Sequence, residues 1–175
     1  MADKFSFKRA ASFAVPAIIF TAIDQWTKIL ILDHLKGSGP VILIKNVLEL
    51  LYVENRGAAF GIMYGMKYVF VVLAAVITCA AFYMFMHMPV RKRFIPFDAA
   101  LILVSAGAIG NVIDRIRLGY VVDFIYFMPI DFPVFNFADI CVTGAAFLII
   151  FLFLFVYKEN DIQQIPFFGN KDHIR

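Results

Sequence analysis

Residues that build metal sites and disulfides are scarce in this chain. Its two cysteines, Cys79 and Cys141, lie inside apolar segments, where a free cysteine behaves as a small hydrophobe. Its three histidines, His34, His87 and His173, are scattered, and none has a partner at the three- or four-residue spacing that a helical metal site requires. The sequence therefore argues against a disulfide framework, a metal cluster and a zinc protease, and we expect no metal.

Charge is scarce as well. Only 17% of the 175 residues are charged, whereas 62% are hydrophobic and gathered in long blocks. This composition is typical of membrane proteins, and the chain has room for a few spans with short connections. We therefore predict one integral membrane domain over residues 1–175. The net charge of +3 is too small and too dispersed for a nucleic-acid partner, which we exclude.

Long apolar stretches predict the membrane spans, because a transmembrane helix needs about 20 mostly apolar residues. Four stretches qualify: about 10–35, 67–88, 94–113 and 135–157. The connection over about 36–66 contains Val41-Ile42-Leu43-Ile44 and Leu50-Leu51-Tyr52-Val53, bounded by turn formers, which favours β-strands. The predicted fold is an all-α membrane protein, a four-transmembrane-helix bundle with a small β-sheet on its outer surface.

Basic residues near the ends of the spans predict the orientation. One set falls on a single side if the chain crosses four times: Lys4, Lys8, Arg9, Arg91, Lys92, Arg93, Lys158 and Lys171. We take that side as the cytoplasm, so both termini are expected there. The longer connections, about 36–66 and 114–134, then lie on the outer side.

Polar residues of separate spans reach a similar depth under this topology, near the outer face. They are Asp24, Lys28, Asn111, Asp114, Arg115, Asn136 and Asp139. Carboxylates at membrane depth are costly to remove from water and usually have a function. Helical spacing places Asn136 and Asp139 on one face of the fourth span, so we predict a shared polar site that Asp123 enters from a loop.

Structural roles remain open for several of these residues. Asp24 and Lys28 are four residues apart and fit a helix-stabilising ion pair as well as a direct role in the site. For Arg115 a structural tether to loop carbonyls or carboxylates is favoured, because its donors form a fork. Asn55 and Asn136 fit caps or turns as well as substrate contacts.

Five short blocks occur together in one order along the chain. They are Asp24-Gln25-Trp26-Thr27-Lys28, Asn55-Arg56-Gly57-Ala58-Ala59-Phe60-Gly61, Gly110-Asn111-Val112-Ile113-Asp114-Arg115, Val122-Asp123-Phe124 and Phe135-Asn136-Phe137-Ala138-Asp139. Each block is weak, but the ordered set resembles the lipoprotein signal peptidase family, also called signal peptidase II.

This resemblance implies an aspartic endopeptidase of the bacterial inner membrane. Such an enzyme removes the signal peptide of prolipoproteins by cleaving before a diacylglyceryl-modified cysteine, with its active site facing the outer leaflet. Asp123 and Asp139 match the catalytic pair, and the supporting positions are Asn55, Asn111, Arg115, Asn136 and Asp24. The resemblance further implies a short helix before the second span and a mobile cover over the site, formed by residues 57–64.

The expected partners are lipidated prolipoproteins and membrane lipid, and we expect a monomer that needs no cofactor. Two other functions fit part of the pattern. A small proton-coupled membrane transporter would use intramembrane carboxylates as a relay, but the acids gather at one face and no discontinuous repeat is present. A non-catalytic membrane chaperone would bind prolipoprotein on the outer sheet and release it uncut.

Overall fold

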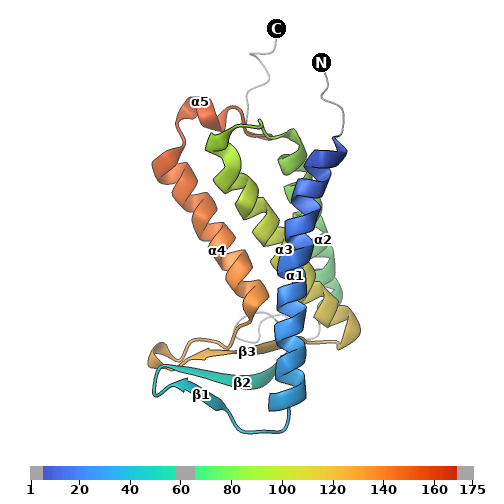
Figure 1. Ribbon diagram of the computed structural model, residues 1–175, viewed down its shortest axis with the longest axis vertical. Coiled ribbons are helices and arrows are strands. Elements are labelled where there is room, and N and C mark those ends of the chain that lie inside the picture. The colour runs from blue at the N-terminus through green and yellow to red at the C-terminus, as the bar shows by residue number, and fades with distance from the viewer. Residues whose placement is uncertain (1–5, 58–65, 169–175) are drawn as a thin grey trace.

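Four long helices form most of the molecule, of which this computed structural model describes residues 6–57 and 66–168. They are α1 (Phe7–Leu35), α2 (Lys67–His87), α3 (Ile95–Arg117), and α4 (Phe137–Phe151), which continues as a π-helical turn, η4 (Leu152–Val156). All four are long and apolar enough to cross a membrane. The predicted four-helix membrane fold is therefore confirmed, and Figure 1 shows the helices side by side.

The third helix differs most from its predicted limits. A short 3-10 turn, η2 (Lys92–Phe94), precedes it, and it runs to Arg117, beyond the predicted end at 113. It stops where Leu118 N–H donates back to the Asp114 carbonyl and Gly119 takes a positive φ of 83°, a common helix ending. Asp114 therefore lies in the last helical turn.

A three-stranded antiparallel sheet covers one end of the bundle, in the order β1 (Val41–Ile44), β2 (Leu48–Asn55), β3 (Val121–Phe127). The strands predicted at 41–44 and 50–53 are confirmed, and they pair as an antiparallel hairpin. The prediction that Asp123 enters from a loop was wrong, because residues 121–127 are a strand paired with β2. Val121 to Phe124 are all buried, so the strand lacks the alternation that would have identified it.

The central helix, α3, packs against α1, α2 and α4. Its approach to α4 depends on Gly107, because a Cβ at this position would collide with the backbone carbonyl of Ala138 and with Val142. Ala145 is fully buried, whereas Gly144 has nothing near its Cβ position. Small residues thus permit a close helix contact, although Gly144 lies outside it.

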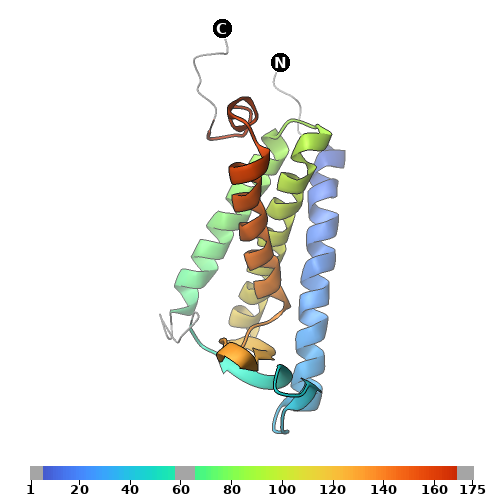
Figure 2. The ribbon, with the colours of Figure 1, turned by 90° about the vertical axis from the view of Figure 1, so that its left-hand side faces the viewer.

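The two ends of the bundle differ. At the end away from the sheet, where α1 begins and the short helix α5 (Glu159–Ile162) lies, buried apolar side chains form one cluster around Phe13, Phe85, Phe94, Phe97 and Tyr157. Figure 2 shows from the side that the start of α1 and α5 lie at one end of the bundle and the sheet at the other. The remaining short element, η3 (Met128–Ile130), follows β3.

Candidate active site

Two aspartates lie on elements that are neighbours in the fold, one on β3 and one in the first turn of α4. Figure 1 shows the start of α4 next to the sheet. Asp123 lies on β3 opposite Val53 of β2, and only 2% of its surface is exposed. Asp139 is in the first turn of α4 and is half-buried. The two side chains therefore come from different elements.

Asn136 connects the two carboxyl groups. Its side-chain Nδ2 donates to Oδ1 of Asp123 at 2.6 Å, and its backbone N–H donates to Oδ2 of Asp139 at 3.1 Å. The Asn136 Oδ1 accepts from the backbone N–H of Asp139 at 3.0 Å, which completes a capping box at the start of α4. Asn136 is thus both a helix cap, as one interpretation of the sequence had it, and a direct contact of both acids.

Two further asparagines donate to the pair. Nδ2 of Asn55, at the end of β2, donates to Oδ2 of Asp123 at 2.8 Å. Nδ2 of Asn111, on α3, donates to Oδ1 of Asp139 at 2.8 Å. All four carboxyl oxygens of the pair therefore accept a hydrogen bond, and such bonds stabilise the ionised form of an acid.

Asp123 nevertheless holds its proton more tightly than an ordinary aspartate. Burial and repulsion by Asp139 raise the pKa of Asp123 to about 6, against the lowering effects of Asn55, Asn136 and the Lys28 charge. The strand position explains the burial, because β3 packs against β2, α1 and α3. Asp123 can therefore keep its proton at a pH where an ordinary aspartate has lost it.

An ionic cluster lies beside the two acids. Nζ of Lys28 is 2.9 Å from Oδ2 of Asp24 and 2.9 Å from Oδ2 of Asp114, and all three residues are at most 2% exposed. The Asp24–Lys28 ion pair that the sequence left open is present, and Asp114 on α3 is its third member. In the part of the chain that the structure describes, no group of three or more His, Cys, Asp or Glu side chains is suited to a metal ion.

The two acids of this cluster hold the segments that carry the aspartate pair. Oδ1 of Asp24 accepts from the backbone N–H of Ala138, next to Asp139, at 3.0 Å. Oδ2 of Asp114 accepts from the backbone N–H of Val122, next to Asp123, at 3.1 Å. Asp24 therefore contacts the site through the backbone of α4.

Gln25 was not identified from the sequence. Its Nε2 donates to Asp24, to Asp114 and to the carbonyl of Gly110, at 3.0 to 3.1 Å, and so joins α1 to α3. Its place beside Asp24 in the first motif was the available signal.

Arg115 holds the chain that follows β2. Its Nη2 donates to the Gly57 carbonyl at 3.2 Å, and its guanidinium lies 4.3 Å from the centre of the Phe70 ring. These contacts agree with the structural tether favoured from the sequence. The predicted cover at 57–64 and the predicted short helix lie outside the described residues, apart from Gly57.

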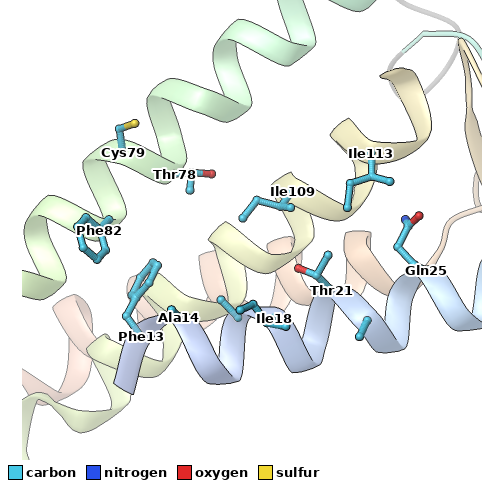
Figure 3. A pocket seen from close by; sticks show the side chains of 12 residues that line it. Phe13, Ala14, Ile18, Thr21, Gln25, Thr78, Cys79, Phe82, Ile109 and Ile113 are labelled. Atoms are coloured by element: carbon cyan, nitrogen blue, oxygen red, sulfur yellow. The ribbon is translucent and has the colours of Figure 1, made fainter. Parts of the chain in front are cut away.

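An apolar cavity of about 630 Å³ lies between α1, α2 and α3 (Figure 3). It runs from Phe13 and Phe82 towards Gln25 and Ile113, so one end approaches the ionic cluster. Its lining is almost entirely hydrocarbon, which suits an apolar occupant.

The fold and the site define a class of protein: a multi-pass membrane protein in which one asparagine hydrogen-bonds to two aspartate carboxyls at one end of the helical bundle. The family model described as signal peptidase (SPase) II matches residues 16–155, and the chain belongs to this family. The transporter alternative gains no support from this membership.

Individual relatives agree with the family model. The chain is 40% identical over 144 residues to the lipoprotein signal peptidase of Clostridioides difficile strain 630, covering 82% of this chain and 95% of that protein. It is 41% identical over 140 residues to the lipoprotein signal peptidase of Halothermothrix orenii, covering 79% of this chain and 92% of that protein. A solved bacterial membrane enzyme structure matches with a TM-score of 0.72 at 33% identity, covering 84% of this chain and 95% of that one.

Proposed function

We propose that this protein is an aspartic endopeptidase that removes the signal peptide of prolipoproteins, cleaving before the diacylglyceryl-modified cysteine. Family membership supports the reaction and the substrate class. The observation that carries the aspartic mechanism is the bridge through Asn136, which contacts Asp123 with its side chain and Asp139 with its backbone. The two carboxyls are thereby held as one unit.

The chemistry follows from one proton on the pair. The ionised carboxyl takes a proton from water while the water oxygen bonds to the scissile carbonyl carbon, and the protonated carboxyl donates to the carbonyl oxygen. As the tetrahedral diol collapses, one of its hydroxyls gives its proton to the ionised carboxyl, the C–N bond breaks, and the leaving amine receives the proton of the other carboxyl, so the pair again holds one proton. No covalent enzyme intermediate forms. The proton belongs to the pair, so neither aspartate is assigned as the permanent acid.

The asparagines support this chemistry by directing donors at the acids. Asn55 and Asn136 donate to Asp123, and Asn111 donates to Asp139. Fixed amide donors therefore stabilise the negative charge of whichever aspartate is ionised. Asp24 and Arg115 act further out, on the backbones of α4 and of the segment after β2. We propose these five residues as supports of the pair.

Substrate binding is proposed to rest mainly on apolar contact, because a signal helix and acyl chains arrive through the lipid. The cavity between α1, α2 and α3 supports this, since it is apolar, lies within the spans and ends near the polar site. If substrate hydrocarbon enters it, Ala22→Trp at its wall raises KM several-fold and leaves kcat nearly unchanged. The matched variant Ile150→Trp, on the exposed surface of α4, leaves both unchanged.

We propose that the sheet end faces the outer leaflet and that both termini are cytoplasmic. The three consecutive basic residues at 91–93, in the short α2–α3 connection, support this orientation. The sheet end also carries basic residues, but Lys36 and Arg56 there pair with Glu54. The test uses single cysteines in a background lacking Cys79 and Cys141. Lys92→Cys should resist an impermeant thiol reagent applied outside the cell, whereas Lys45→Cys should react. The reverse labelling pattern would show that the protein has the opposite orientation.

The function is tested by cleavage in detergent. The purified chain is expected to cut a lipidated prolipoprotein and leave its unlipidated form intact, with the new N-terminus at the modified cysteine. Mass spectrometry of both products identifies the bond. Proton flux in liposomes without proteolysis would favour the transporter, and binding without cutting would favour the chaperone.

A further inference from the structure

Each asparagine beside the aspartate pair has its amide orientation fixed by a second contact. The backbone N–H of Gly57 donates to Oδ1 of Asn55, and that of Asp139 donates to Oδ1 of Asn136, both at 3.0 Å. Because these carbonyl oxygens are occupied, the NH₂ groups are directed at the carboxyls. Oδ1 of Asn111 is held by two side chains instead, accepting from Lys28 Nζ at 2.9 Å and from Asn136 Nδ2 at 3.2 Å.

Lys28 is well suited to hold an amide in place. It is 1% exposed, and in the described part of the chain no other lysine or arginine is fully buried. Its three protons have three acceptors, Asp24, Asp114 and Asn111, each 2.9 Å from Nζ. Buried ammonium groups require such complete pairing, so the contact to Asn111 completes the coordination of Lys28.

We propose that Lys28 is a positioning residue of the reaction: its ammonium holds the carbonyl of Asn111 and thereby turns the Asn111 NH₂ towards Asp139. This inference rests on the proposed function of the aspartate pair. A rotated Asn111 amide would place its oxygen against Oδ1 of Asp139, where two partial negative charges repel. With Lys28 in place, Asn111 is a donor to Asp139 throughout the reaction.

The charge of Lys28 also reaches the pair. The charged groups that interact with Asp123 are Lys28 on α1, Arg115 on α3 and Asp139 on α4. Glu54 on β2 and Asp114 on α3 lie beside its strand neighbour Val122, and Asp24 pairs with Lys28. Among these, Lys28 lowers the pKa of Asp123 and Asp139 raises it. Removing the Lys28 charge should therefore raise the pKa of Asp123 and move the pH profile of cleavage towards alkaline pH.

The test compares Lys28→Met with the unmodified chain on a lipidated prolipoprotein peptide. We expect kcat to fall about 10- to 100-fold, KM to change less than about threefold, and the pH profile to move to higher pH. Lys28→Arg should recover part of kcat and restore the profile. The matched control is Arg9→Met, which removes a cation paired with Asp98 at the far end of the bundle and should leave the profile unmoved.

The proposal is overturned if folded Lys28→Met keeps the wild-type kcat and pH profile, or if its loss matches the unfolded fraction alone. If Lys28→Met does not fold, the double variant Lys28→Met/Asp114→Asn replaces it, because it keeps the formal charge of the cluster at −1; its kcat should still fall. If neither variant folds, Lys28 is purely structural and the proposal is overturned. If the unmodified chain does not cleave, the proposed function fails, but an infrared titration of Asp123 in Lys28→Met still tests the inference and should give a raised pKa.

Discussion

The two ends of the helical bundle are held together by different interactions. At the sheet end, directional hydrogen bonds and ion pairs join α1, α3, α4 and β3 through Asp24, Lys28, Asp114 and Asn136. At the other end, aromatic rings form the core, as in the contacts of Phe97 with Phe153 and Tyr157, and the ion pairs Arg9–Asp98 and Arg93–Asp161 lie around that core. Hydrogen bonds fix positions to fractions of an ångström, whereas apolar packing mainly supplies stability. The comparison therefore predicts that changes at the sheet end alter catalysis, and changes at the aromatic end alter stability.

Asn136→Ser is expected to have the largest effect on catalysis among the supporting residues. Serine retains the N-cap of α4 but removes the amide that donates to Asp123, so kcat should fall about 10²- to 10³-fold with folding largely preserved. Steady-state cleavage kinetics and thermal unfolding measure the two effects. A variant that unfolds without a loss of kcat per folded molecule would reverse the comparison.

Phe97→Ala is the counterpart at the aromatic end. Phe97 is 2% exposed, and its removal leaves a cavity that should cost about 3–5 kcal/mol of stability. Activity per folded molecule should remain close to that of the unmodified chain. Denaturant unfolding in mixed micelles, combined with cleavage at a temperature where both proteins are folded, measures the pair of values. A large loss of kcat in the folded variant would show that the two ends are coupled.

Gly107→Ala and Gly144→Ala form a matched pair with a smaller expected effect. An added methyl at Gly107 meets the Ala138 backbone and should push α3 from α4, costing about 1–3 kcal/mol and separating Asn111 from Asp139. The same methyl at Gly144 meets nothing within 4 Å and should be neutral or slightly stabilising. Equal effects at both positions would contradict the α3–α4 contact described above.

The smallest predicted effect is the pH dependence of stability due to Asp123. Its pKa of about 6 in the folded protein exceeds the value of about 3.9 for an unfolded aspartate, so folding takes up a proton between these values. This contribution to stability is present below about pH 4 and is lost as the pH rises through 6. The difference in unfolding free energy between the unmodified chain and Asp123→Asn should follow this curve. A flat difference would show that folding leaves the pKa of Asp123 unchanged.

The sequence predicted the helices well because their apolar stretches are long. The shared helical face predicted for Asn136 and Asp139 was wrong, because Asn136 is the extended residue before α4, and the two side chains are brought together by the capping box. The sequence did not predict β3, since four consecutive buried residues with an aspartate among them resemble neither an alternating strand nor a plain apolar one. Strand formation there depends on pairing with β2, which is distant in sequence. The contact of Lys28 with Asn111 was equally hidden, because the direction of a side chain across two helices has no local signal.

Cleavage by Asp123→Asn, Asp139→Asn and the double variant tests most directly whether the two carboxyls work as one unit. Each single change should lower kcat about 10³-fold or more, and the double variant should lose little beyond that. Asp131→Asn is the control, since Asn tolerates the left-handed turn there and can still accept from Tyr126. Losses that multiply in the double variant, or near wild-type cleavage by either single variant in folded form, would contradict a shared acid–base pair.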